Sequence, residues 1–111
     1  MAGTLRKLAG PAYIANAAAN IYTPSASTIL TTIKHIHFAN KDSSARTFSL
    51  YIGATGGSAG GTELFKDVSI AIAGYLDWYC SLPLLSTEFL SGIASAASAI
   101  VIIVNGELSV I

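Results

Sequence analysis

Charged residues are scarce in this sequence: Asp, Glu, Lys and Arg make up only 11% of its 111 residues, against roughly a quarter in an average soluble domain. Six basic and six acidic residues cancel, so the formal net charge at pH 7 is zero. A protein that binds nucleic acid needs a basic stripe or face, so we predict no nucleic-acid partner. A neutral surface with few charges repels its own copies weakly, which favours self-association into a homo-oligomer.

Cysteine and long apolar runs are also nearly missing. Cys80 is the only cysteine, so no disulfide can form within the chain, and its aromatic neighbours favour a buried small hydrophobe. The apolar run over residues 93–104 is far shorter than the roughly 20 residues of a transmembrane helix, so we predict no membrane span. Gly10, Pro11 and Asn16 interrupt the N-terminal stretch, which argues against a secretory signal peptide.

Helical periodicity is absent from every extended window of the sequence. Instead, about eight short runs rich in β-branched and aromatic residues are separated by turn residues roughly every 8–12 positions. This spacing predicts an all-β protein: a single antiparallel β-sandwich, jelly-roll-like, with about eight short strands. We expect residues 1–24 to form an extended N-terminal arm with the first edge strand, and residues 25–111 to form the sandwich.

The stretch Ile29–Ile52 has the clearest strand pattern. Residues 40–44 in its middle are Asn, Lys, Asp, Ser and Ser, which favour turns because several of them bond their own backbone. Apolar and polar residues alternate on either side of this turn. The apolar residues that we expect to face the core are Ile36, Phe38, Phe48, Leu50 and Ile52. We predict a β-hairpin that supplies the central strands of one sheet, with Asp42 and Arg46 paired across its turn.

Residues 53–61 read GATGGSAGG, which invites comparison with a phosphate-binding loop. Such a loop needs a lysine and a hydroxyl residue directly after its glycines, whereas the next lysine here is Lys66. We predict a long surface loop. The sequence also has no GxSxG nucleophile motif, and its carboxylates are scattered. We therefore predict that the protein is not an enzyme and binds no cofactor.

His35 and His37 share one face of a strand and resemble half of a zinc site. No second pair of ligands has matching spacing, so we expect surface or interface histidines and no metal. Alternation in the run after residue 74 places Trp78 on the core face and Tyr75 and Tyr79 on the other. These two tyrosines leave a carbohydrate-binding platform open as an alternative.

The order of several short motifs resembles small structural proteins of tailed bacteriophages. The motifs are LAGPAY (8–13), IYTP (21–24), IKHIHFAN (33–40), SARTFSLYI (44–52) and ASAASA (94–99) before an Ile/Val strand with Gly106 and Glu107. The likeness spans nearly the whole chain, and the aromatic segment 75–85 departs from it. It implies a compact antiparallel sandwich found in the virion, as a head decoration protein or as a tail- or fibre-associated piece.

The resemblance implies a non-enzymatic virion protein whose partners are capsid or tail subunits. We predict head decoration or cement first, a tail, neck or fibre module second, and a carbohydrate-binding sandwich third. The expected mechanism is burial of apolar surface, with the N-terminal arm reaching a neighbouring subunit. The predicted interface residues lie in this arm and in the glycine loop: Leu5, Leu8, Tyr13, Ile14, Ile21, Gly56, Gly57 and Gly60.

Overall fold

The computed structural model describes residues 4–24, 29–53 and 62–110, and these form eight β-strands. The strands are β1 (Thr4–Tyr13), β2 (Ala19–Tyr22), β3 (Ile29–Asn40), β4 (Arg46–Gly53), β5 (Glu63–Ile70), β6 (Tyr75–Leu84), β7 (Phe89–Ala94) and β8 (Ile100–Val110). Within this part of the chain, no helix is long and apolar enough to cross a bilayer. The predicted all-β class is confirmed.

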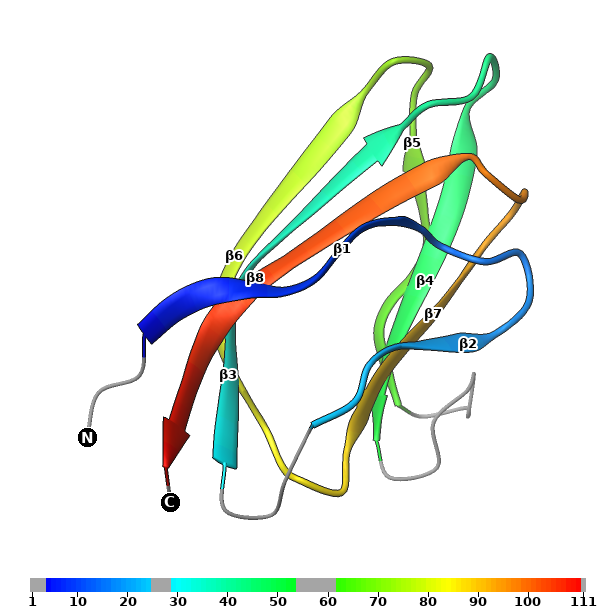
Figure 1. Ribbon diagram of the computed structural model, residues 1–111. Coiled ribbons are helices and arrows are strands. Elements are labelled where there is room, and N and C mark those ends of the chain that lie inside the picture. The colour runs from blue at the N-terminus through cyan, green and yellow to red at the C-terminus, as the bar shows by residue number, and fades with distance from the viewer. Residues whose placement is uncertain (1–3, 25–28, 54–61, 111) are drawn as a thin grey trace.

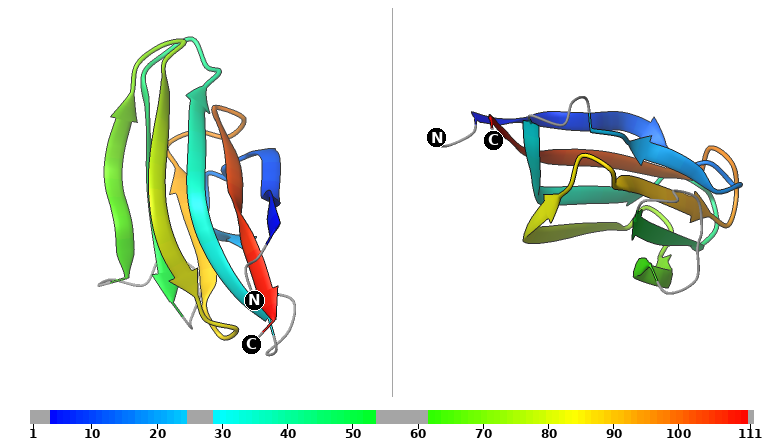
Figure 2. Two further views of the ribbon diagram at one scale, coloured as in Figure 1. Left: turned by 90° about the vertical axis from the view of Figure 1, so that its left-hand side faces the viewer. Right: turned by 90° about the horizontal axis from the view of Figure 1, so that it is seen from below.

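The strands form two four-stranded sheets that pack face to face (Figure 1; Figure 2). One sheet has the order β1–β8–β3–β6, here called the first sheet, and the second sheet has the order β2–β7–β4–β5. All printed pairings are antiparallel. Only β4 and β5 are consecutive strands of one sheet; every other connection crosses between the sheets. This is the topology of a jelly roll, as predicted.

The core lies between the sheets and is built by alternating residues. In β3, Ile36 and Phe38 are fully buried, whereas His35 and His37, which alternate with them, are half-buried on the outer face. Phe38 of the first sheet stacks on Phe48 of the second, with ring centroids 4.1 Å apart. Alternation along β3 therefore gives one face to the core and the other to solvent.

The predicted hairpin over Ile29–Ile52 is wrong, although both of its strands exist. β3 pairs with β6 and β8, while β4 pairs with β5 and β7, so the two strands lie in opposite sheets. The buried Asn40 holds the connection: its amide donates to the carbonyl oxygens of Ser44 and Ile70 at 2.9 and 3.0 Å. The predicted pair in this turn is confirmed, since Arg46 Nε donates to Asp42 Oδ2 at 2.6 Å.

Most of the expected N-terminal arm is paired within the sandwich. β1 is the edge strand beside β8, and β2 is the edge strand beside β7, so residues 4–22 contribute to both sheets. Ile14 between them is 1% exposed and belongs to the core. These residues do not extend from the sandwich as a free arm, and removing them would leave β8 without its partner on one side and would take Ile14 out of the core. Local sequence could not reveal this because the partner residues lie roughly 70 to 100 positions further along the chain.

Candidate functional site

The outer face of the first sheet carries five neighbouring side chains that we call the histidine–tyrosine cluster. They are His35 and His37 of β3, and Tyr75, Asp77 and Tyr79 of β6. The antiparallel register places His35 opposite Tyr79 and His37 opposite Asp77. Tyr75 is 71% exposed and Tyr79 is 75% exposed. The predicted outward face of both strands is confirmed, and pairing brings the two sets of residues together.

Asp77 joins the two histidines. Its Oδ1 accepts hydrogen bonds from His35 Nε2 at 2.8 Å and from His37 Nδ1 at 2.7 Å. On the other side of the His35 ring, Asn105 Nδ2 lies 3.0 Å from Nδ1 and donates to it. One nitrogen of a neutral imidazole donates and the other accepts, so these partners select the His35 tautomer with its proton on Nε2. The network orients both rings against the sheet.

The same hydrogen bonds change the acidity of Asp77. Donation from His37, and then from His35, stabilises the ionised carboxylate and holds the pKa of Asp77 below its ordinary value. The partial burial of this side chain, which is 30% exposed, acts in the opposite direction and is the smaller influence. The cluster therefore keeps a carboxylate charge under mildly acidic conditions.

Replacing Asp77 with Asn is expected to lower the stability of the fold at neutral pH and to flatten its decline in acid. A carboxylate whose pKa is lower in the folded state adds stability above its ordinary pKa, and this contribution disappears as pH falls through the folded pKa. The difference between wild type and Asp77→Asn should be present at about pH 5 and vanish well below about pH 3.9, the ordinary pKa of Asp. Urea unfolding across this range measures it. The double variant His35→Gln/His37→Gln should lose the same acid slope, and an unchanged slope in either variant would contradict the network.

Each tyrosine of the cluster packs against a different histidine. The rings of His35 and Tyr79 stack with centroids 4.6 Å apart, and those of His37 and Tyr75 with centroids 6.0 Å apart. Four residues of strand separate the two tyrosines, which is about 13 Å. They share a face, as predicted, but they line two different hollows.

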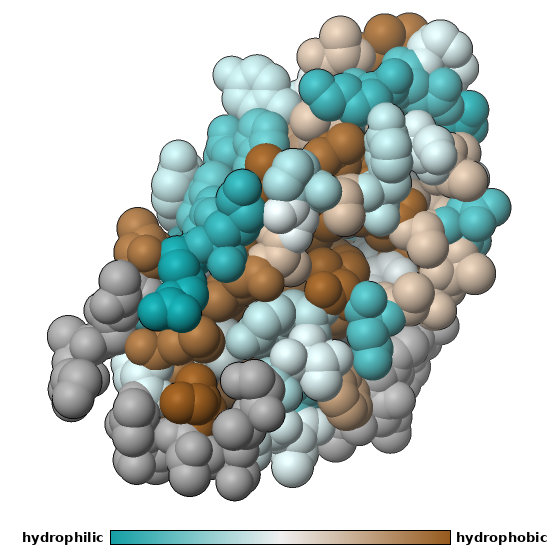
Figure 3. All heavy atoms as spheres, viewed as in Figure 1, coloured by the Kyte–Doolittle hydropathy of each residue, from teal (hydrophilic) through white to brown (hydrophobic). Residues whose placement is uncertain are grey.

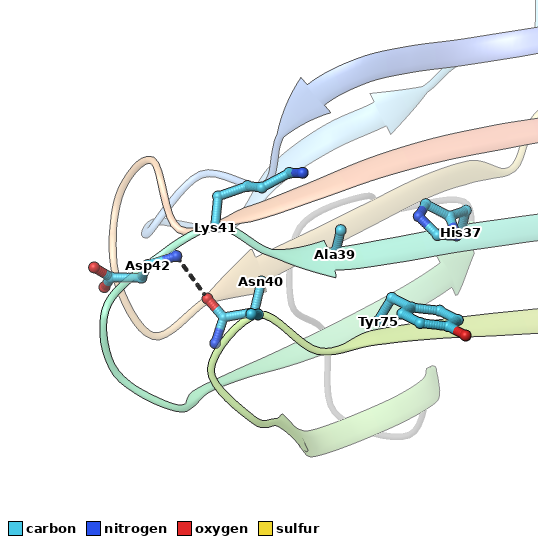
Figure 4. Close-up of a pocket in the computed structure, with 7 residues that line it drawn as sticks. His37, Ala39, Asn40, Lys41, Asp42 and Tyr75 are labelled. Carbon is cyan, nitrogen blue, oxygen red and sulfur yellow. Dashed lines mark hydrogen bonds between the residues drawn. The ribbon is translucent and has the colours of Figure 1, made fainter.

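The first hollow lies where β3 and β6 reach the turns at one end of the sheet, with a volume of about 500 Å³. Figure 4 shows His37 and Tyr75 on neighbouring strands along it, with Asn40 and Asp42 in the turn beyond. Asn40 Oδ1 accepts from the backbone N–H of Asp42 at 2.9 Å (Figure 4). The ion pair with Arg46 holds the pKa of Asp42 below its ordinary value. Asn40, Asp42 and Arg46 in this turn are therefore engaged with their neighbours, and Lys41 is the basic residue that lines the hollow.

The second hollow lies toward the other end of the same face, with a volume of about 550 Å³, and we call it the basic hollow. All four strands of the sheet contribute to its lining, which consists of Leu5, Arg6, Lys7, Lys34, His35, Tyr79 and Asn105. Neighbouring strands place Lys7 opposite Asn105, Asn105 opposite His35, and His35 opposite Tyr79. Figure 3 shows this outer face at the left rim of the molecule, where hydrophilic atoms gather. Three of the six basic residues of the chain line this single hollow.

The described residues offer no ready metal centre or reactive thiol. Across residues 4–24, 29–53 and 62–110, no group of three or more His, Cys, Asp or Glu is placed to hold a metal ion. Cys80 is half-buried against the core, and its thiol donates to the Ile33 carbonyl oxygen at 3.3 Å. Burial raises the pKa of this thiol, which keeps it protonated and unreactive near neutral pH.

The predicted interface residues lie in different environments. Leu5 is 66% exposed and lines the basic hollow. Tyr13, which is 52% exposed, lines a smaller hollow of about 140 Å³ beside β2 together with Ile21. Leu8 packs partly buried against the core, and Ile14 lies within it, so Ile14 has no surface to offer a partner. Gly56, Gly57 and Gly60 lie outside the described residues.

Sequence reasoning missed the residues that complete the outer face. Alternation along β6 placed Asp77 on the face of the two tyrosines, but Asn105, Arg6, Lys7 and Lys34 come from three other strands, and nothing in their spacing connects them. The alternation within β3 and within β6 was visible, but their pairing was not. The only signal for the cluster was that two histidines and two tyrosines each occupied the outer face of a predicted strand.

These features define a small jelly roll whose first sheet turns a polar and aromatic face outward. No protein-family model matches the sequence, and no curated protein matches it. Among solved structures, the chain is similar to a protein chain whose structure bears the description "Bacillus endospore appendages form a novel family of disulfide-linked pili". The TM-score is 0.54 and the identity 13%, over 100% of this chain and 91% of that chain. This likeness supports the all-β sandwich along the whole sequence.

Proposed function

We propose that this chain is a non-enzymatic structural subunit that joins a repeating assembly through noncovalent contacts. The observation that carries the proposal is the open edge of β6, on a molecule whose formal net charge is zero. A sheet edge presents unpaired N–H and C=O groups that can pair with another chain. The likeness to a chain from pili is consistent with such a role.

Three of the four edge strands are irregular or short, which blunts them against pairing. β1 has two register shifts against β8 and contains Pro11, which has no N–H. β2 has four residues and one register shift. β5 has two register shifts against β4 and carries Lys66 and Asp67, the latter with a φ of 49°. Further pairing is thus discouraged along these edges.

β6 differs from the other edges because it carries little charge, and because its one register shift and its Pro83 both come after Tyr79, which leaves residues 75–79 regular. It has ten residues, among which Asp77 is the only charged one, and that side chain is bonded to both histidines. The N–H of Asn40 donates to the Gly74 carbonyl oxygen at 3.0 Å, so this carbonyl points toward β3, while the Gly74 N–H donates to Ala71 within the turn. Because direction alternates along a strand, the backbone groups of Tyr75, Asp77 and Tyr79 point toward the open edge. A second copy can pair there without disturbing the sheet.

Disulfide linkage does not transfer from the pilus structure to this chain. A linear polymer held by disulfides needs at least two cysteines per subunit, and this chain has one. The thiol of Cys80 also faces the backbone of β3 instead of the surface. Reducing agents should therefore leave the assembly intact.

The location that we propose is the virion, because the sequence motifs resemble structural proteins of tailed phages. Within the virion we propose head decoration, with capsid subunits as partners. The likeness to a pilus chain favours the alternative of an extended fibre, in a tail or in an extracellular appendage. The number of copies per particle separates these cases: hundreds would indicate the head, and a few tens or fewer a tail or neck.

A pair of matched variants tests the role of the β6 edge. Tyr75→Pro/Tyr79→Pro removes two N–H groups from the open edge, whereas Tyr75→Ala/Tyr79→Ala removes the same rings and keeps both N–H groups. We expect wild type and the alanine variant to form oligomers in sedimentation velocity, with or without reductant, and the proline variant to stay monomeric. Circular dichroism checks that both variants fold. A monomeric wild type at every concentration, or equal assembly of both variants, would overturn the proposal.

A further inference from the structure

The basic hollow concentrates positive charge on a molecule that has none overall. Arg6, Lys7 and Lys34 line it, and no carboxylate does. The three remaining basic residues are elsewhere: Lys41 lines the first hollow, Arg46 is paired with Asp42, and Lys66 lies on β5 of the second sheet. Gathering like charges on one face has an electrostatic cost unless an anion is bound there. The distribution therefore points to an anionic ligand.

The three cations have no carboxylate partner in the described part of the chain. Ion pairs there involve Asp77 with the two histidines and Asp42 with Arg46. Lys34 Nζ donates only to the Ser81 hydroxyl, at 3.2 Å. Glu107 lies on the same face opposite Leu5, but it forms no ion pair with Lys7 in this part of the chain. The ammonium and guanidinium groups are thus available to an external anion.

The hollow also contains an apolar platform. The Tyr79 ring is 75% exposed and stacked on His35, so its position is fixed. Leu5, which is 66% exposed, adds a second apolar surface to the lining, and Asn105 adds a side-chain amide. A small inorganic anion would not pack against the apolar surfaces of Tyr79 and Leu5. A ligand that combines a ring with an acidic group would use every part of the lining.

We propose that the basic hollow binds an acidic saccharide, with the cations holding its carboxylate or sulfate and Tyr79 packing against its sugar ring. Its volume of about 550 Å³ lies within the range of small-ligand pockets. A nucleic acid would need a basic stripe along the face, whereas the hollow at the opposite end of this face is lined by a single basic residue, Lys41. The site is independent of the β6 edge, since its contacts are side chains above the sheet.

The test is isothermal titration calorimetry of the full chain with a short oligogalacturonate and with neutral oligogalactose of equal length. We expect the acidic sugar to bind, the neutral sugar to bind at least about tenfold more weakly, and added salt to reduce the difference. Equal binding of both sugars, or binding of neither, would overturn the proposal. Inorganic sulfate competing at the same concentration as the saccharide would overturn it too, because a plain anion site would then suffice.

Matched variants locate the binding. Lys34→Glu and Tyr79→Ala should each weaken oligogalacturonate at least about tenfold. Lys66→Glu makes the same charge change on the second sheet, and Tyr75→Ala removes the tyrosine of the other hollow; both should bind as wild type does. An equal loss with Lys66→Glu would mean nonspecific attraction, and no loss with Tyr79→Ala would exclude ring packing. Either outcome would contradict the proposed site.

Discussion

Replacing Gly106 with alanine should remove a large part of the stability of the sandwich. Gly106 is buried in β8, between Arg6 of β1 and Ile33 of β3. A Cβ at this position would overlap the carbonyl oxygen of Thr32 and lie 2.8 Å from Leu8 Cδ1. Leu8 can rotate away, but the Thr32 carbonyl belongs to the backbone of a central strand and cannot move without separating β3 from β8.

Overpacking of a core typically costs about 1–3 kcal/mol, and a clash with fixed backbone belongs at or above the upper end. A loss of about 3 kcal/mol is a substantial share of the roughly 5–15 kcal/mol that stabilises a small domain. Urea unfolding followed by Trp78 fluorescence measures it. Gly53→Ala is the matched control, because its Cβ would meet Thr62 Cγ2 at an ordinary 3.4 Å. Similar midpoints for the two variants would contradict the close approach at Gly106.

The sequence was informative wherever a property depends on neighbours along one strand. Alternation assigned Phe38 and Phe48 to the core and Tyr75 and Tyr79 to the surface, and the structure agrees. The eight strands and the sandwich class follow from the same local signal together with the spacing of turns. These are properties that a strand has whichever partner it pairs with.

Pairing was much less predictable, because it depends on residues far apart in the sequence. A turn rich in Asn, Asp and Ser fits a hairpin and an inter-sheet connection equally well, so the segment after Asn40 was read as a hairpin. What distinguishes the two is the bond from Asn40 to Ile70, thirty residues away. The strand partners of β1 and β2 were hidden for the same reason.

Only part of the candidate site could be predicted from the sequence, because the rest depends on which strands pair. His35 and His37 could be placed on one face, but the Asp77 carboxylate that binds both is 42 and 40 residues away. The basic hollow had no sequence signature, since Lys7 and Lys34 come close only when β8 lies between their strands. The tyrosine platform considered from sequence is divided by the structure, with only Tyr79 in the basic hollow.

The two proposed uses of β6 are compatible because they involve different directions from the same strand. Backbone groups of Tyr75, Asp77 and Tyr79 lie in the plane of the sheet and point to its edge, whereas their side chains stand above the sheet. Pairing of a second copy along the edge would extend the outer face sideways and repeat the basic hollow beside it. An assembly would then present many copies of a weak saccharide site, which raises the overall avidity.

Replacing Phe48 with alanine should destabilise the fold by about 3–5 kcal/mol, the usual cost of removing a buried aromatic side chain. Phe48 is 1% exposed and stacks on Phe38 across the two sheets at 4.1 Å. Phe65 packs against Phe48 at 5.9 Å and edge-on against Trp78 at 4.9 Å. The cavity left by Phe48→Ala would thus lie between the sheets, where the surrounding rings are held by strands of both sheets and cannot readily collapse into it.

Unfolding in urea with Trp78 as the fluorescent probe measures this loss, and Ile72→Ala provides the comparison. Ile72 is 60% exposed, so its truncation should change the free energy of unfolding by less than about 0.5 kcal/mol. Because Phe38 and Phe48 are in contact, the double variant Phe38→Ala/Phe48→Ala should lose less than the sum of the two single losses. If the two single losses in free energy of unfolding added up to the loss in the double variant, the rings would stabilise the fold independently. That result would contradict a stabilising contact between Phe38 and Phe48 across the sheets.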